Sequence, residues 1–156
     1  MIFVTIGTQA PFDRFIRIID EIAPSLKEPI IAQTYKGEYK PQNIKTVDFL
    51  PPDEFNKLFN EARLIISHAG MGTIISAMNK QKPIIIFPRK ASLGEHRNEH
   101  QMATAKKMEQ LNYVYVAYNE EQLQTLIMTP DLKPLHQLGD FASQQLIKSI
   151  SEFIKR

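Results

Sequence analysis

The sequence predicts a protein of the α/β class, built on a parallel sheet of about six strands with helices on both faces. Short runs rich in isoleucine and valine alternate with longer amphipathic stretches, which is typical of consecutive strand–helix units. With 156 residues, 43% of them hydrophobic, the chain has the size of one domain and can bury a core of ordinary extent. We therefore expect residues 1–156 to form a single domain.

The N-terminal segment predicts three strands separated by a helix and a loop. Residues 2–6 form an apolar strand that ends at a glycine turn, and Pro11 then opens a helix whose apolar residues recur at helical spacing up to Ala23. Residues 30–35 form the second strand. After a polar loop, residues 44–50 form the third.

The middle of the chain predicts two helices around a fourth strand. Two prolines end the third strand, and Asp53 and Glu54 then place negative charge in the first turn of a helix, where it is favourable. Residues 64–67 form the fourth strand. A turn at 68–73 leads from it directly into a helix over residues 74–79.

The last third of the chain repeats the alternation and completes a Rossmann-like order of elements. Residues 84–87 form a fifth strand between two prolines, and residues 98–111 form a long helix. A sixth strand at 113–117 and a helix at 120–128 follow. The tail over residues 139–155 has the apolar pattern of one more helix, which either packs on its own domain or docks a partner.

Composition excludes several classes of protein. The chain has no cysteine, which excludes disulfides, thiolate metal sites and thiol nucleophiles. A formal net charge of +2 does not indicate a dedicated nucleic-acid binder. Away from the N-terminus the longest apolar run is residues 84–87, far short of the roughly 20 residues of a membrane-spanning helix. Residues 1–6 lack a basic leader, so we expect a cytoplasmic protein.

Three turns are candidates for a ligand site, because ligands of parallel sheets bind beyond the carboxyl ends of the strands. They are residues 7–9, 68–73 and 89–101. In the middle turn two glycines would let the backbone approach an anion such as a diphosphate at the start of a helix. The alternative is a tight turn that needs glycine only for positive φ. His68 beside this turn either donates a hydrogen bond to phosphate or is a packed residue.

Other motifs in the sequence indicate which ligands and reactions are disfavoured and which stay open. The glycines are not followed by the lysine of a P-loop and do not form GxGxxG, which disfavours nucleoside-triphosphate hydrolysis and nicotinamide binding. His96 and His100 would share a helix face only if their helix begins early, and without a third ligand we expect no metal. The basic cluster Arg89, Lys90 and Arg97 meets phosphate or an anionic membrane surface, or is a solvated loop.

Four separated motifs together resemble glycosyltransferase family 28, in its UDP-sugar-binding C-terminal domain. They are FVTIGTQ at 3–9, FLPPDEFNKLFNEARLIISHAGMGTI at 49–74, KPIIIFPR at 82–89 and EHRNEHQMATA at 95–105. The resemblance implies the C-terminal half of a GT-B glycosyltransferase. It is strongest to small stand-alone members: bacterial polysaccharide proteins of the PssE type and the soluble subunit of the eukaryotic dolichol-linked N-acetylglucosamine transferase.

The resemblance also implies a set of donor-site residues, ordered from the uracil to the sugar. They are Phe49 and Leu50 beside the uracil, Gly7 and Thr8 opposite the diphosphate, Gly70, Met71, Gly72 and Thr73 at the helix start that holds the phosphates, and His100 and Gln101 at the sugar or its phosphate.

One position departs from the family pattern. The family usually has a glutamate that accepts both ribose hydroxyls, and here Ser76 occupies that position. A neutral hydroxyl is a weaker partner than a carboxylate. We therefore expect either modest nucleotide affinity or a ribose held by another acidic side chain, Glu95 or Glu99.

The resemblance implies a hexosyltransferase subunit that binds the UDP-sugar donor in polysaccharide, exopolysaccharide or glycolipid synthesis. A membrane-associated partner would hold the lipid-linked acceptor and supply the base, so the chain alone would bind donor and transfer nothing. We expect this partner to recruit it to the inner face of the membrane. Helix-start amides with Arg89 or Arg97 would stabilise the departing diphosphate without a metal or cofactor, and His68 and Arg89 are the side-chain candidates. The alternatives are a non-catalytic UDP-sugar-binding or interaction module and an epimerase-like enzyme, which needs a longer chain.

Overall fold

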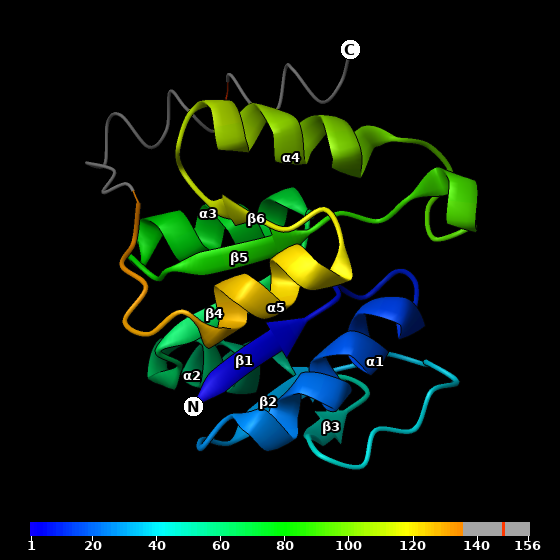
Figure 1. Ribbon diagram of the computed structural model, residues 1–156, viewed down its shortest axis with the longest axis vertical. Helices are drawn as coiled ribbons and strands as arrows, with labels where there is room; N and C mark the ends of the chain where they lie inside the picture. The colour runs from blue at the N-terminus through cyan, green and yellow to red at the C-terminus, as the bar shows by residue number, and fades with distance from the viewer. Residues whose placement is uncertain (136–147, 149–156) are drawn as a thin grey trace.

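The computed structural model describes residues 1–135 and 148, and its centre is a parallel sheet of six strands in the order β3-β2-β1-β4-β5-β6 (Figure 1). The strands are β1 (Ile2–Thr5), β2 (Ile30–Gln33), β3 (Lys45–Val47), β4 (Leu64–His68), β5 (Ile84–Phe87) and β6 (Tyr115–Val116). The α-helices are α1 (Asp13–Ile22), α2 (Pro52–Glu61), α3 (Met71–Asn79), α4 (His100–Gln110) and α5 (Glu120–Met128), and short 3-10 helices lie at Ala23–Ser25 and Ala91–Leu93.

The direction in which the sheet grows reverses next to β1. The chain adds β2 and β3 on one side of β1, then crosses back and adds β4, β5 and β6 on the other side. The loops after β1 and β4 therefore leave adjacent strands and diverge. In open parallel sheets this reversal opens a crevice at the carboxyl ends of the strands, where ligands bind.

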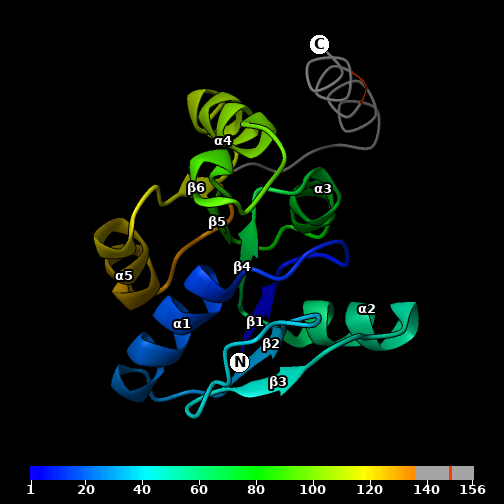
Figure 2. The same cartoon turned by 90° about the vertical axis from the view of Figure 1, so that its right-hand side faces the viewer.

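Helices cover both faces of the sheet, as the sequence predicts. Helices α1 and α5 lie on one face, and α2, α3 and α4 on the other (Figure 2). The central strands are buried on both sides because each face meets its own apolar cluster, and this is why β1, β4 and β5 read as continuous apolar runs. On the first face Phe12, Phe15 and Phe87 stack together.

Several predicted boundaries are corrected by the structure. The third strand covers Lys45–Val47 rather than 44–50, because Phe49 and Leu50 are apolar but follow the strand without belonging to the sheet. Helix α1 begins at Asp13 rather than Pro11. Helix α4 begins at His100 rather than residue 98, so His96 and His100 do not share a helix face. Helix α3 begins at Met71, three residues earlier than predicted.

Two further predictions concern the C-terminal tail and membranes. The helix predicted over 139–155, with its docking role, lies outside the described residues apart from Lys148. Within the described part of the chain, no helix combines the length and the apolar character that crossing a membrane requires.

Candidate functional site

A cleft of about 1000 Å³ opens at the carboxyl ends of β1, β4 and β5. The structure brings together in it all three turns that the sequence singles out: the loop after β1, the start of α3, and the loop from β5 into α4. The cleft lies at the reversal in strand order, as expected for an open parallel sheet. Its lining is Ile6, Gly7, Thr8, Gln9, Ala10, His68, Ala69, Gly70, Met71, Gly72, Thr73, Arg89, Glu95, His96, Arg97, His100, Gln101 and Thr104.

The N-terminus of α3 points amide donors at this cleft. Gly70 is the N-cap, no side chain caps the helix, and its first turn has no acidic residue. Ile74 is the first residue whose amide bonds back, to the carbonyl of Gly70 at 3.3 Å. Among the described residues, the amides of Met71, Gly72 and Thr73 have no acceptor. Unpaired amides and the positive end of the helix dipole make this turn an anion site.

The glycines of the cleft are required for different reasons. Gly7 has a φ of 78°, whereas Gly70 and Gly72 do not have positive φ, so a tight turn with positive φ does not explain the pair. A Cβ at Gly70 would lie 2.5 Å from Nε2 of His68, and one at Gly7 would lie 3.0 Å from the same atom. The imidazole thus fills the space that these two glycines leave. At Gly72 a Cβ would meet nothing within 4 Å, because this position faces open space.

His68 and Gln101 are joined at the floor of the cleft. Nδ1 of His68 lies 3.0 Å from Nε2 of Gln101, while Oε1 of Gln101 accepts from the backbone amides of Ala69 (3.2 Å) and Arg89 (3.0 Å). Burial, and then the charge of Arg89, lower the pKa of His68 to about 3, so the imidazole is neutral at pH 7. Gln101 is buried but lines the cleft, and its predicted role at the sugar or its phosphate stays a prediction.

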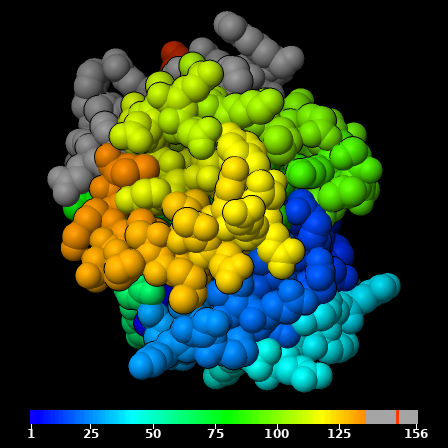
Figure 3. Space-filling model, in the orientation of Figure 1, coloured from blue at the N-terminus to red at the C-terminus, as the bar shows by residue number. Residues whose placement is uncertain are grey.

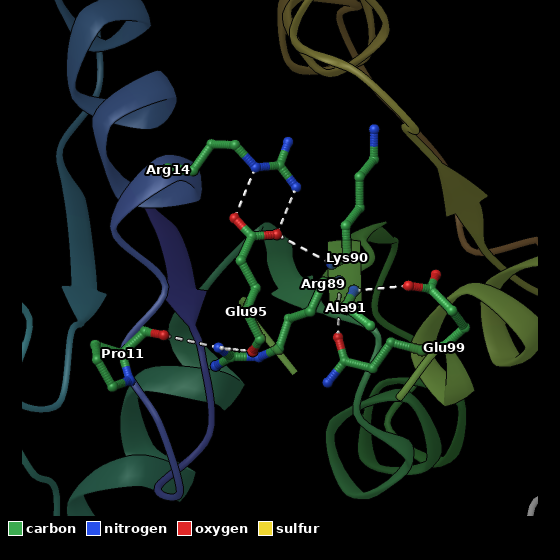
Figure 4. A network of polar contacts seen from close by, with 8 residues as sticks. Pro11, Arg14, Arg89, Lys90, Ala91, Glu95 and Glu99 are labelled. Atoms are coloured by element: carbon green, nitrogen blue, oxygen red, sulfur yellow. Dashed lines mark hydrogen bonds and ion pairs between the residues drawn. The ribbon is translucent and has the colours of Figure 1, made fainter. Parts of the chain in front are cut away.

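The structure corrects the expected role of Arg89 in binding the diphosphate. It is 3% exposed, and its guanidinium donates to the carbonyls of Ile6 (2.9 Å), Ala10 (2.8 Å), Pro11 (2.7 Å) and Glu95 (3.3 Å). Its Nε also faces Nδ1 of His68 at 3.5 Å. All five N–H donors of the side chain are therefore directed at protein atoms, and none is left for a diphosphate. Figure 4 shows the guanidinium turned toward Pro11 and Glu95.

Glu95 and Glu99 are also engaged within the protein. Arg14 donates to both carboxylate oxygens of Glu95, at 2.7 and 2.9 Å, and the amide of Lys90 adds a third bond at 3.0 Å (Figure 4). Glu99 accepts from the amide of Ala91 at 2.8 Å. The three bonds to Glu95 argue against that acid as the replacement for the missing ribose-binding glutamate, whereas Glu99 is exposed with one oxygen unbonded among the described residues, and its role stays a prediction.

The Arg14–Glu95 pair joins two walls of the cleft. Arg14 lies on α1, directly after the loop that follows β1, and Glu95 lies in the loop between β5 and α4. On the surface seen in Figure 3 the blue α1 region lies directly against the bright green β5–α4 loop. With the Arg89 bonds, this pair fixes the two loops relative to one another.

The three basic residues of the predicted cluster have different surroundings. Arg89 is buried. Lys90 is partly buried and does not line the cleft, whereas Arg97 is exposed and lines it. Among the described residues Arg97 has no ion-pair partner, so it is the guanidinium available to an anion. His100, which is exposed, also lines the cleft, and its predicted role at the sugar stays a prediction.

The predicted nucleoside end is separate from the cleft. Phe49 is 63% exposed, Leu50 is buried in the core, and Ser76 is partly buried on α3; none of the three lines the cleft. Their roles beside the uracil and ribose stay predictions.

Among residues 1–135 and 148, no group of three or more acidic or histidine side chains is arranged to hold a metal ion.

Two residues of the site were missed from the sequence. Thr104 lines the cleft, is 4% exposed and lies one helical turn after Gln101, a spacing that the sequence does show. Arg14 contacts Glu95 across 81 positions of sequence, and no local pattern indicates that pairing.

The chain is similar in sequence to known proteins. The model of the glycosyltransferase family 28 C-terminal domain matches residues 1–156. The UDP-N-acetylglucosamine transferase subunit ALG13 of Candida albicans is 29% identical over 93 residues, which cover 60% of this chain and 30% of that protein. The human subunit of the same name is 27% identical over 127 residues, covering 73% of this chain and 11% of that protein. The chain thus spans less than a third of these relatives.

Solved structures show the same fold. The solution structure of ALG13 has a TM-score of 0.65 at 19% identity and covers 99% of this chain and 96% of that one. The crystal structure of Acinetobacter baumannii MurG has a TM-score of 0.55 at 19% identity and covers 96% of this chain and 49% of that one.

Proposed function

This chain belongs to the glycosyltransferase family 28 C-terminal domain family, and on that premise we propose that its cleft binds the diphosphate of a UDP-sugar. It would then be the donor-binding part of a glycosyltransferase. Two of its relatives are named as UDP-N-acetylglucosamine transferase subunits, which supports UDP as the nucleotide and a partner polypeptide as the other part. The observation that carries the proposal is the uncapped N-terminus of α3, which opens on the cleft.

The electrostatics of the cleft support an anionic ligand. The free amides of α3 and the unpaired Arg97 are donors, and the one acidic side chain in the lining, Glu95, is neutralised by Arg14. A bound diphosphate would therefore meet partial or full positive charge from α3 and from the β5–α4 loop. Two adjacent phosphates fit such a divided site better than a single carboxylate does.

The same groups suit the departure of a diphosphate. In glycosyl transfer the bond between the anomeric carbon and the diphosphate oxygen breaks, and negative charge grows on the leaving group. Amides and a guanidinium that are already in place stabilise that charge without reorganisation. We propose that a partner subunit supplies the acceptor and the base, because the carboxylate in the cleft is paired with Arg14. This partner would also bring the chain to the membrane.

Calorimetric titration of the purified chain with UDP, UMP and uridine tests the proposal. We expect UDP to bind more tightly than UMP and uridine to bind weakest, because the donors of α3 and Arg97 act on phosphate. Equal affinity for UDP and uridine would contradict the proposed diphosphate site. Titration with several UDP-sugars, with and without a co-expressed partner, then identifies the donor.

A second candidate function is a UDP-sugar-binding or interaction module without catalysis. It is favoured by Ser76 at the position of the family's ribose-binding glutamate, and by the engagement of both Glu95 and Glu99 elsewhere. Synthesis of the polysaccharide or glycolipid by a strain that carries a bulky residue at position 72 tests whether nucleotide binding is needed. Loss of synthesis supports a nucleotide-binding role, whereas unchanged synthesis supports an interaction module.

A further inference from the structure

The orientation of the Gln101 side chain is determined by its neighbours. Its Oε1 accepts from two backbone N–H groups, those of Ala69 and Arg89, at 3.2 and 3.0 Å. The reverse orientation would place the NH₂ group against two donors, which is excluded. The NH₂ group therefore points at Nδ1 of His68, 3.0 Å away, and donates to it.

A second donor faces the same nitrogen. Nε of Arg89 lies 3.5 Å from Nδ1 of His68, and a guanidinium has no acceptor. Nδ1 thus meets donors from α4 and from the end of β5 and has to act as an acceptor. The proton of a neutral imidazole is then on Nε2.

Nε2 lies on the other edge of the ring, between the two glycines of the cleft wall. It is the atom closest to the Cβ positions of Gly70 and Gly7, at 2.5 and 3.0 Å. His68 itself is partly exposed and lines the cleft. Side chains at 7 or 70 would cover this edge, so the glycines leave the Nε2–H group beside the free amides of α3.

The surroundings also keep the ring uncharged. Among the described residues, the titratable groups that act on His68 are Arg89 and His96, and both disfavour an imidazolium. Burial and the positive charge of Arg89 lower the pKa of His68 to about 3. The proton on Nε2 is therefore the only one the ring carries across the physiological range of pH.

We propose that Gln101 is a positioning residue, which together with Arg89 holds His68 as the neutral tautomer with its proton on Nε2, and that this N–H donates to a phosphate oxygen in the cleft. The identity of the anion rests on the proposed function. The tautomer is a property of the free protein and can be measured without ligand.

The first measurement is the nitrogen NMR spectrum of the histidine rings in the full chain, with His68 assigned by His68→Gln. In the wild type we expect a protonated Nε2 and an unprotonated Nδ1. Gln101→Glu keeps an oxygen for the two backbone amides but turns an acceptor toward Nδ1, so we expect Nδ1 to become protonated and the pKa of His68 to rise. Gln110→Glu places the same change at the exposed end of α4 and should leave His68 unchanged.

The second measurement is the dissociation constant of UDP between pH 5.5 and 8, for each variant and for the wild type. The two are compared as a ratio, because the ionisation of UDP itself then cancels. In Gln101→Glu the neutral ring presents a bare Nε2 to phosphate at high pH and an imidazolium at low pH. We expect the ratio to rise about tenfold or more with pH, the effect of losing one charge-assisted hydrogen bond. Gln101→Met, which adds no acceptor, should give a ratio that does not change with pH.

The outcomes separate this inference from the proposed function. A wild-type His68 protonated on Nδ1, or a Gln101→Glu protein whose His68 titrates as in the wild type, overturns the inference whatever UDP does. A pH-independent ratio for Gln101→Glu overturns the donation to phosphate. Failure of UDP to bind the wild type contradicts the proposed function, and the NMR spectrum still decides the tautomer.

Discussion

Replacing Gly72 by aspartate should weaken anion binding strongly while stabilising the fold. Position 72 is in the first turn of α3, its φ is not positive, and a Cβ there meets nothing within 4 Å, so the new side chain fits without strain. Removing a helical glycine and adding negative charge at a helix N-terminus should together stabilise the protein by about 0.5–1 kcal/mol. For a chain of this length the melting temperature should rise by about 1–4 °C.

The cost to binding follows from Coulomb's law. A carboxylate about 5 Å from a phosphate charge repels it by about 1–3 kcal/mol, between the dielectric constants of water and of a protein surface. With two phosphate charges, UDP should bind at least about thirtyfold more weakly. Calorimetric titration measures the affinity and thermal unfolding measures the stability.

Two variants serve as controls for this prediction. Gln122→Glu adds the same charge to the first turn of α5, where Gln122 is exposed and outside the cleft, and should leave UDP affinity unchanged. Gly72→Ala tests the effect of size alone. A Gly72→Asp protein that is folded and stable but still binds UDP like the wild type would refute the assignment of the α3 N-terminus as the phosphate site.

Three further predictions concern other parts of the molecule. Arg97→Ala should weaken UDP binding about fivefold to tenfold and reduce its salt dependence, whereas Lys90→Ala should change neither. Titration of both variants at two salt concentrations compares them, and equal effects would contradict the role of Arg97. Gln81 directly follows the C-cap of α3 and has a φ of 55°, so Gln81→Gly should raise the free energy of unfolding by about 0.5–1 kcal/mol in urea titrations, and a loss of stability would count against this reasoning. The pKa of His68 is about 3 when folded, against 6.5 as its ordinary value, so the unfolded state binds the extra proton between these values. The stability of the wild type relative to His68→Gln should therefore be fully present above pH 6.5 and decline as the pH falls, by at most about 1.4 kcal/mol per pH unit in urea titrations; a constant difference would contradict the buried neutral imidazole.

The fold was predictable because its signals are local. Runs such as residues 84–87 are apolar throughout and lie between prolines, so the strand and its ends are both visible in the sequence. The early start of α3 was not predictable, because Gly72 disfavours a helix interior. The first turn of a helix tolerates glycine, and this is where Gly72 lies. The third strand was predicted too long because the apolar residues Phe49 and Leu50 follow it without belonging to the sheet.

The site was predictable as a place but not as a set of contacts. Glycines, polar residues and strand ends identified the three loops that meet in the cleft. Which charged side chains remain free depends on partners far along the chain: Arg89 reaches carbonyls 78 to 83 positions away, and Arg14 takes the carboxylate of Glu95. Residue types cannot reveal this, so Arg89 and Glu95 were assigned to the ligand although their side chains bind other parts of the protein.

The bonds of Arg89 have a consequence for motion. The guanidinium of Arg89 joins the loop after β1 to the loop after β5, so we do not expect these two loops to close over a bound ligand. Free and occupied forms of this chain should superimpose closely. If the proposed partner subunit exists, shielding of a reacting sugar from water would have to come from rigid-body movement of the whole domain against that partner.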